Sequence, residues 1–200
     1  MTMRTAATLA LMAIVAAQPV GAARDLPRDW RRVATLPDRD RLRRLRMAWA
    51  DGVRLAYANG LGGSVRSQGA LLDPDVALAD PLPPPGRYRC RVVKLGGPQG
   101  FSARAAVPCE IAATGPVFGF SMLGAAQRTT GTLFADSDVR GVFLGSLAMA
   151  DEGHVLAYGR DVNRNMAGVV ERVGPSRWRI GFPYPRFEAT LDVIELVPNS

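Results

Sequence analysis

The C-terminal part of this chain is divided into short runs of β-forming residues, and this rhythm constrains the fold more than any other feature. From Arg87 onward, turn-forming residues recur about every 8 to 12 residues, which is typical of an antiparallel sandwich or barrel. No helical spacers separate the runs, so a parallel sheet with crossover helices is not expected. We predict segments of strand character at residues 87–93, 107–111, 117–123, 127–134, 140–148, 154–158, 166–173, 177–183 and 189–197.

The alternation within these runs indicates which faces are buried. It is clear in residues 177–183, where Trp178, Ile180 and Phe182 share one face, and irregular in residues 191–196, which could instead form a short helix. About eight strands suffice to close a small barrel. We therefore predict a mainly β fold, an antiparallel β-barrel or sandwich of about eight strands preceded by an N-terminal amphipathic α-helix.

The first 23 residues have the pattern of a secretory signal peptide. A basic start at Met1 to Arg4 precedes the apolar run Thr5 to Ala17, and small residues follow as far as Ala23. The apolar run is shorter than the roughly 20 residues of a membrane-spanning helix, and no later stretch approaches that length. We expect a periplasmic or secreted protein with no transmembrane span in the mature chain. We expect the whole chain to divide into three parts: a signal peptide at residues 1–23, an Arg-rich helix and proline-rich connection at 24–86, and an antiparallel β domain at 87–200.

Export gives the two cysteines a specific meaning. Cys90 and Cys109 are the only cysteines, and in an oxidising compartment we expect them to form a disulfide. Each lies in a predicted strand of one antiparallel hairpin. If the cysteines lie directly opposite each other, Arg89 faces Glu110 and the turn falls between Gln99 and Gly100.

Positive charge is concentrated in the segment that precedes the β domain. Residues 24–46 hold nine Arg and four Asp, and Thr35 to Asp38 resembles the start of a capped helix that ends near Asn59-Gly60. One interpretation is a docked surface helix whose arginines pair with nearby aspartates. The other is contact with an anionic envelope surface. The arginines concerned are Arg39, Arg41, Arg43, Arg44 and Arg46. Nucleic acid is not an expected partner of an exported chain.

Four segments carry a resemblance to a known group of proteins: residues 87–96, 158–161, 166–174 and 182–188. In these segments the chain, from Trp30 onward, resembles an uncharacterised family of small exported alphaproteobacterial proteins, a domain of unknown function. This resemblance implies no activity and no catalytic residues. More loosely, an exported barrel with one disulfide is similar in plan to lipocalin-like and bacterial protease-inhibitor barrels, a likeness of fold that says little about function.

The polar segment around residue 160 is a second candidate contact site. Its guanidinium, amide and phenol groups suit a carboxylate, phosphate or sugar, although a polar hairpin connection would look the same. Calcium binding is not expected, because Met166 and Arg172 replace the turn glycine and the bidentate glutamate of a calcium loop. The candidate contact residues are Tyr158, Arg160, Asp161, Asn163, Arg164 and Asn165.

Catalytic and metal-binding patterns are weak in this chain. His154 is the only histidine, it lies in a turn-like segment, and no serine occupies a nucleophile-elbow motif. We therefore predict no catalytic residues, no metal site and no cofactor.

The expected function is a non-enzymatic binding or interaction module of the cell envelope, acting on a small ligand, an envelope protein or an anionic surface. The alternatives are a periplasmic hydrolase that uses carboxylates or His154, and an inhibitor of a secreted protease or muramidase.

Overall fold

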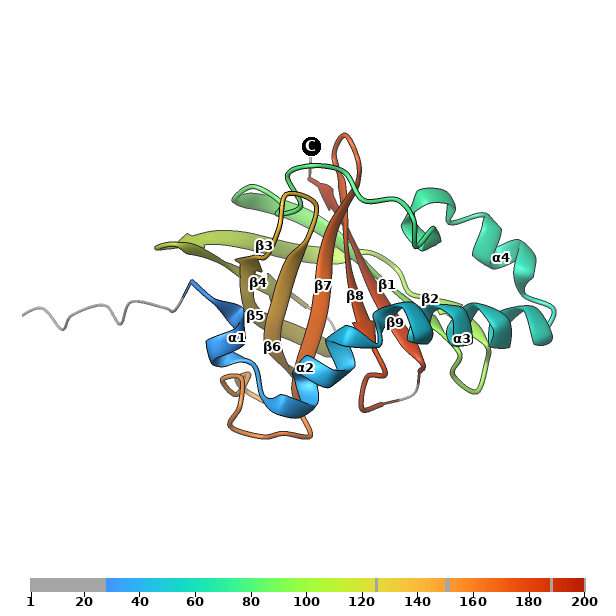
Figure 1. The fold of residues 1–200 in the computed structure, drawn as a ribbon, viewed down its shortest axis with the longest axis horizontal. Coiled ribbons are helices and arrows are strands. Elements are labelled where there is room, and N and C mark those ends of the chain that lie inside the picture. Colours follow the sequence, from blue (N-terminus) through green and yellow to red (C-terminus); the bar gives the residue numbers. More distant parts are fainter. Residues whose placement is uncertain (1–27, 125, 150–151, 188, 200) are drawn as a thin grey trace, which may run out of the picture.

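The computed structural model describes residues 28–124, 126–149, 152–187 and 189–199. The predicted signal peptide, residues 1–23, lies outside the described residues. The described chain consists of a short helical part followed by a closed antiparallel β-barrel (Figure 1).

The barrel has eight strands and one additional short strand. Each strand pairs with its neighbour in an antiparallel manner, and pairing of β1 with β9 closes the barrel; β2 adds to the free length of β1 beyond β3. The predicted fold class is therefore confirmed, as a barrel rather than a sandwich. The strands are β1 (Gly86–Leu95), β2 (Phe101–Ala103), β3 (Val107–Thr114), β4 (Val117–Met122), β5 (Gln127–Ala135), β6 (Gly141–Met149), β7 (Asn165–Gly174), β8 (Arg177–Pro183) and β9 (Leu191–Pro198).

The helical part contains more elements than the single predicted helix. Thr35 caps α2 as expected, because its hydroxyl accepts a hydrogen bond from the Asp38 backbone N–H. The predicted helix is interrupted at Arg44, which leaves the helical conformation, and a further helix forms in the glycine-rich segment that follows residue 60. The elements are α1 (Trp30–Val33), α2 (Leu36–Arg43), α3 (Leu45–Ala58), α4 (Gly62–Arg66) and the 3₁₀ turn η1 (Gly69–Leu72).

Helices α2 and α3 cover one side of the barrel, over strands β7 to β9 and β1 (Figure 1). Trp49 on α3 belongs to a cluster with Val93 of β1 and Val193 of β9, and Leu42 on α2 belongs to a cluster with residues of β6 and β7. Strands β6 to β9 are consequently buried on both faces. This explains why the last strand lacked a clear alternation: residues 191–196 form a strand, and their apolar side chains face the barrel interior on one side and α3 on the other.

Side chains fill the barrel interior. Three aromatic rings meet edge to face near its centre, with centroids 5.8 Å apart for Phe120 and Phe143 and 5.5 Å apart for Phe143 and Phe182. At one end, a space of only about 30 Å³ remains beside Thr129 and Phe187, which is room for about one water molecule. The proline-rich run of residues 80–86 contributes Leu82 to the packing of this core.

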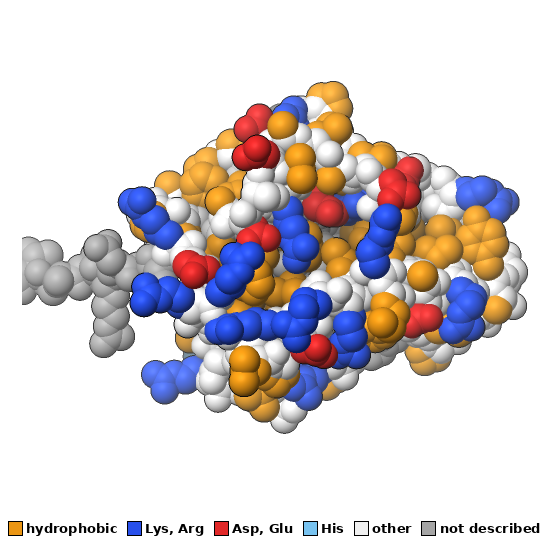
Figure 2. All heavy atoms as spheres, in the orientation of Figure 1, with side chains coloured by type: hydrophobic (Ala, Val, Ile, Leu, Met, Phe, Trp, Pro, Cys, Tyr) orange, Lys and Arg blue, Asp and Glu red, His pale blue; other side chains and the backbone are white. Residues whose placement is uncertain are grey.

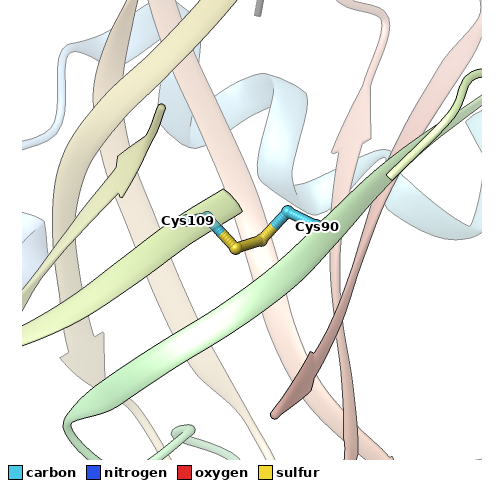
Figure 3. The surroundings of a disulfide bond; sticks show 2 residues. All are labelled: Cys90 and Cys109. Atoms are coloured by element: carbon cyan, nitrogen blue, oxygen red, sulfur yellow. A yellow bond between two sulfur atoms is a disulfide. The ribbon is translucent and has the colours of Figure 1, made fainter. Parts of the chain in front are cut away.

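The disulfide is present, but the strand register differs from the predicted one. Cys90 and Cys109 are bonded, with Cα atoms 5.8 Å apart (Figure 3). Cys109 lies opposite Tyr88, and Cys90 lies opposite Val107, so the two cysteines are diagonal neighbours. The turn closes earlier than expected, because the Gly96 N–H binds the Gly100 carbonyl and β2 intervenes before β3. The register shifts by two residues, which leaves both side chains on the inner face.

The pairing of Arg89 with Glu110 is therefore wrong. Arg87 lies opposite Glu110, and Arg89 lies opposite Pro108. The predicted strand 154–158 is also wrong, because this segment belongs to the loop between β6 and β7. In this loop the Tyr158 side chain points towards α2, where its hydroxyl donates a hydrogen bond to Asp38.

Candidate functional site

A hollow lies outside the barrel, between helices α1 to α3, the turn that joins β5 to β6, and strands β7 and β8. Its volume is about 740 Å³, within the range of small-molecule sites. Figure 2 shows Lys and Arg side chains gathered on this face around a hydrophobic centre. The walls carry three carboxylates, those of Asp75, Asp136 and Glu171. They carry six guanidinium groups, from Arg31, Arg39, Arg43, Arg46, Arg140 and Arg179. We call this hollow the arginine cleft; it has a surplus of positive charge.

The deepest arginine in the cleft has a structural role. Arg179 on β8 is 1% exposed, and its Nε and Nη2 both lie 2.7 Å from a Glu171 carboxylate oxygen. It donates further hydrogen bonds to backbone carbonyls in the chain that follows α4, including that of Asp73 at 2.6 Å. The guanidinium also lies 4.6 Å from the centre of the Trp49 ring. Arg179 therefore attaches residues 70–76 to the barrel and has little capacity left for a ligand.

One end of the cleft is held together by Asp136, in the turn between β5 and β6. Its Oδ1 accepts a hydrogen bond of 2.7 Å from the Trp30 indole and lies 2.9 Å from Nη2 of Arg31. Its Oδ2 lies 3.5 Å from Nε of Arg140. These contacts connect α1 to the barrel. They also mean that Arg31 and Arg140 are already paired with a carboxylate.

Two arginines of α2 supply the positive charge that is open to a ligand. Arg39 donates hydrogen bonds to the carbonyls of Ala34 and Arg31, and among the described residues it forms no ion pair. Arg43 pairs with Asp40 at 3.2 Å, but both side chains are at least half exposed. Exposed pairs contribute little and exchange readily with other partners. Arg39 and Arg43 can therefore bind a phosphate or carboxylate group through their guanidinium donors.

The structure separates the five arginines proposed for surface contact. Arg39, Arg43 and Arg46 line the cleft. Arg44 is exposed elsewhere, 3.0 Å from Asp40 and over the ring of Tyr184. Arg41 is buried, and its side chain binds Asp38 and the carbonyl of Asn165. Arg41 thus serves the interior of the protein rather than its surface.

Several residues of the second candidate site also have partners within the protein. Asn165 is buried; its amide donates to Asp38 and accepts the Gly159 N–H. Arg164 pairs with Glu152 at 2.6 Å. Asp161 accepts the backbone N–H of Asn163 at 2.9 Å, and Arg160 is exposed. These residues do not share the arginine cleft.

The two predicted sites meet at one buried carboxylate, Asp38. It accepts hydrogen bonds from Thr35, Arg41, Tyr158 and Asn165. Burial raises its pKa, but the hydrogen bonds from Tyr158, Arg41 and Thr35 and the charge of Arg41 outweigh burial, so the pKa is lowered from 3.8. An ionised carboxylate that accepts this many hydrogen bonds is a poor proton donor or acceptor. The role of Asp38 is therefore structural, and it connects α2 to the loop between β6 and β7.

Sequence reasoning did not find Trp30, Arg31, Asp136, Arg140, Glu171 or Arg179 as cleft residues. The alternation of Arg179 with Trp178 and Ile180 does indicate an outward-facing arginine in the middle of strand 177–183. No local pattern in the residues before this strand indicates which helix would cover the face that carries Arg179.

Comparison with known families assigns the chain to a group. The model of a domain of unknown function, DUF4893, matches residues 30–196. The chain belongs to the DUF4893 family. The matched region of this DUF4893 protein includes the whole arginine cleft and almost the whole barrel. Comparisons with curated proteins and with solved structures found no match.

Within the described residues, His, Cys, Asp and Glu side chains form no group of three or more that could hold a metal ion. No helix in the same part of the chain has the length and apolar character needed to cross a bilayer.

Proposed function

We propose that this DUF4893 protein is a non-enzymatic binding module of the cell envelope that takes an anionic ligand into the arginine cleft. The observation that carries the proposal is the charge of the cleft, where six guanidinium groups face three carboxylates. Arg39 and Arg43 on the open rim are the residues that would contact the ligand first. Guanidinium forks match the geometry of phosphate and carboxylate groups.

Export to the periplasm or the medium is part of this proposal. It is supported by the sequence pattern of residues 1–23 and by the disulfide between Cys90 and Cys109, since structural disulfides persist in oxidising compartments. We also propose that the relatives are small exported alphaproteobacterial proteins. The likeness to lipocalin-like barrels concerns only the barrel architecture, because side chains fill the interior of this barrel and the ligand would bind outside it.

Binding is favoured over hydrolysis by the state of the candidate catalytic groups. His154 is exposed in the loop between β6 and β7, and in the described part of the chain its side chain has no hydrogen bond or ion pair. The three cleft carboxylates are each paired with arginine, at 2.6 Å for Asp75 and Arg46. A hydrolase would need a nucleophile beside a base, or a carboxylate able to exchange a proton.

Pyrophosphate is a suitable first probe, and isothermal titration calorimetry is the measurement. We expect saturable binding at low ionic strength that weakens as salt is added. The double variant Arg39→Gln/Arg43→Gln should bind at least tenfold more weakly than the wild-type protein. Arg54→Gln is the matched control, because Arg54 is an exposed arginine of α3 that does not line the cleft.

Two results would contradict the proposal. One is the absence of saturable binding of pyrophosphate and of methyl phosphate to the wild-type protein. The other is equal loss of affinity in the double variant and the Arg54→Gln control, which would indicate attraction to net charge instead of binding in the cleft.

A further inference from the structure

A second hollow of about 590 Å³ continues from the arginine cleft along α3. Its walls come from α3, α4 and the segment that ends at Asp75, and they are mainly apolar. The apolar lining residues are Trp49, Ala50, Val53, Tyr57, Val65 and Leu72. We call this hollow the apolar groove.

The cleft and the groove are adjacent, and one ion pair lies at their junction. Arg46, Trp49, Pro74 and Asp75 line both hollows. Nη2 of Arg46 lies 2.6 Å from Asp75, and Nη1 donates to the Pro74 carbonyl at 3.2 Å. Both side chains are about 70% exposed, at 69% and 73%. Such an exposed pair can be displaced at little cost in free energy, so it does not separate the two hollows permanently.

Charge and apolar surface lie at opposite ends of the combined hollow. The cleft has a surplus of guanidinium groups, whereas in the groove two arginines are balanced by two aspartates. At the far end of the groove, Arg66 is held by Tyr57, with Nη1 3.3 Å from the phenolic oxygen and the guanidinium 5.8 Å from the ring centre. The unbalanced positive charge is therefore confined to the Arg39 and Arg43 end.

From this arrangement we infer that the ligand is an anionic amphiphile, a single alkyl or acyl chain that ends in a phosphate or carboxylate. This inference rests on the proposed function and names the class of its ligand. The anionic head would bind Arg39 and Arg43, and the chain would lie in the groove against Val53, Val65 and Leu72. Each hollow alone has the volume of a ligand site.

The shape of the apolar surface favours a single chain over a bilayer. The groove residues line a hollow, and three of them, Trp49, Val65 and Leu72, are buried. A single chain can enter this space, whereas the flat surface of a membrane would contact only the exposed rims. Transfer of the chain from water into the groove would supply hydrophobic free energy in addition to the ionic contact.

The test is a series of alkyl phosphates of increasing chain length, titrated into the oxidised protein by calorimetry. Methyl, butyl, octyl and dodecyl phosphate share one head group, and each is kept below its critical micelle concentration. We expect affinity to rise with chain length, by up to about fourfold for each CH₂ group that becomes buried.

A pair of variants locates the chain. Ala50 is exposed and lines only the groove, so Ala50→Gln places a long polar side chain there without changing the net charge. This variant should bind methyl phosphate as the wild-type protein does and lose most of the gain with chain length. Ala58→Gln is the control, because Ala58 is also exposed on α3 but does not line either hollow.

Each outcome separates the inference from the function on which it rests. Equal affinity for methyl and dodecyl phosphate would overturn the amphiphile and leave the anion site in place. An Ala50→Gln variant that keeps the full chain-length gain would also overturn the amphiphile. Failure of both pyrophosphate and methyl phosphate to bind would overturn the proposed function as well. If vesicles containing phosphatidylglycerol bind the protein and monomeric dodecyl phosphate does not, the occupant is a membrane surface and the inference is wrong.

Discussion

The phenolic hydroxyl of Tyr158 donates a hydrogen bond to the carboxylate of Asp38, which lies 120 residues earlier in the chain. The same hydroxyl accepts the backbone N–H of Thr35, the residue that caps α2. One side chain from a loop of the barrel therefore fixes the start of the helix that carries Arg39 and Arg43. The position of the arginine cleft depends on this contact.

The Tyr158 contact makes stability depend on alkaline pH. Burial, and then the hydrogen bond to Asp38, raise the pKa of Tyr158 to about 12. In the unfolded chain a tyrosine ionises near pH 10. Because the folded state holds the proton more tightly, the stabilisation is complete below about pH 10 and is lost as pH rises towards 12.

Replacement of Tyr158 by Phe should reveal this dependence. We expect Tyr158→Phe to lower the free energy of unfolding by about 1 to 2 kcal/mol at neutral pH, because Asp38 loses a donor. The difference between the wild-type and variant proteins should shrink between pH 10 and 12. Urea unfolding at a series of pH values measures it, and a difference that stays constant over this range would contradict the assigned role.

Arg179 should be sensitive even to a conservative replacement. Arg179→Lys keeps the charge but removes the planar group that reaches Glu171 and several carbonyls at once. We expect a loss of about 2 to 4 kcal/mol in the free energy of unfolding, because buried acceptors are left without donors. Arg54→Lys, at an exposed position of α3, should change it by less than about 0.5 kcal/mol. Equal effects of the two replacements would show that the described contacts of Arg179 carry no special weight.

The disulfide should contribute measurably to stability. Cys90 and Cys109 are 19 residues apart, and closing a loop of this length lowers the entropy of the unfolded chain by an amount worth about 3 kcal/mol. The Cys90→Ala/Cys109→Ala variant should therefore unfold at lower urea concentration. Intact-mass analysis of the protein purified without reductant, alkylated with and without prior reduction, should find two protected thiols. Two free thiols in the unreduced sample would contradict the bond.

Asp75 is expected to oppose anion binding. It lies at the junction of the two hollows and pairs with Arg46, so Asp75→Asn removes a negative charge from both. We expect pyrophosphate and octyl phosphate to bind about two- to fivefold more tightly, with a change in stability below about 0.5 kcal/mol because the pair is exposed. Asp51→Asn, on α3 outside both hollows, is the control, and an equal gain there would indicate an effect of net charge only.

The outline of the barrel was predictable from the residues themselves. Turn residues and apolar alternation are local, so strands such as 177–183 were correctly bounded, and Thr35 marked the start of α2. The pairing of the only two cysteines followed from their number. Their register did not, because a short extra strand and a tighter turn between them change the alignment by two residues without changing the faces.

The class of fold, the disulfide partners and the concentration of arginine before and within the first helices follow from the order of the residues alone. Which of these arginines are available to a ligand depends on how the folded chain packs. Arg41 and Arg179 are held by nearby carboxylates and by carbonyls from distant segments, while Arg39 and Arg43 remain at the rim of a hollow. This is because the surroundings of a charged side chain depend on which segments pack against it. Contacts between residues more than 100 positions apart in the sequence leave no local pattern in the chain.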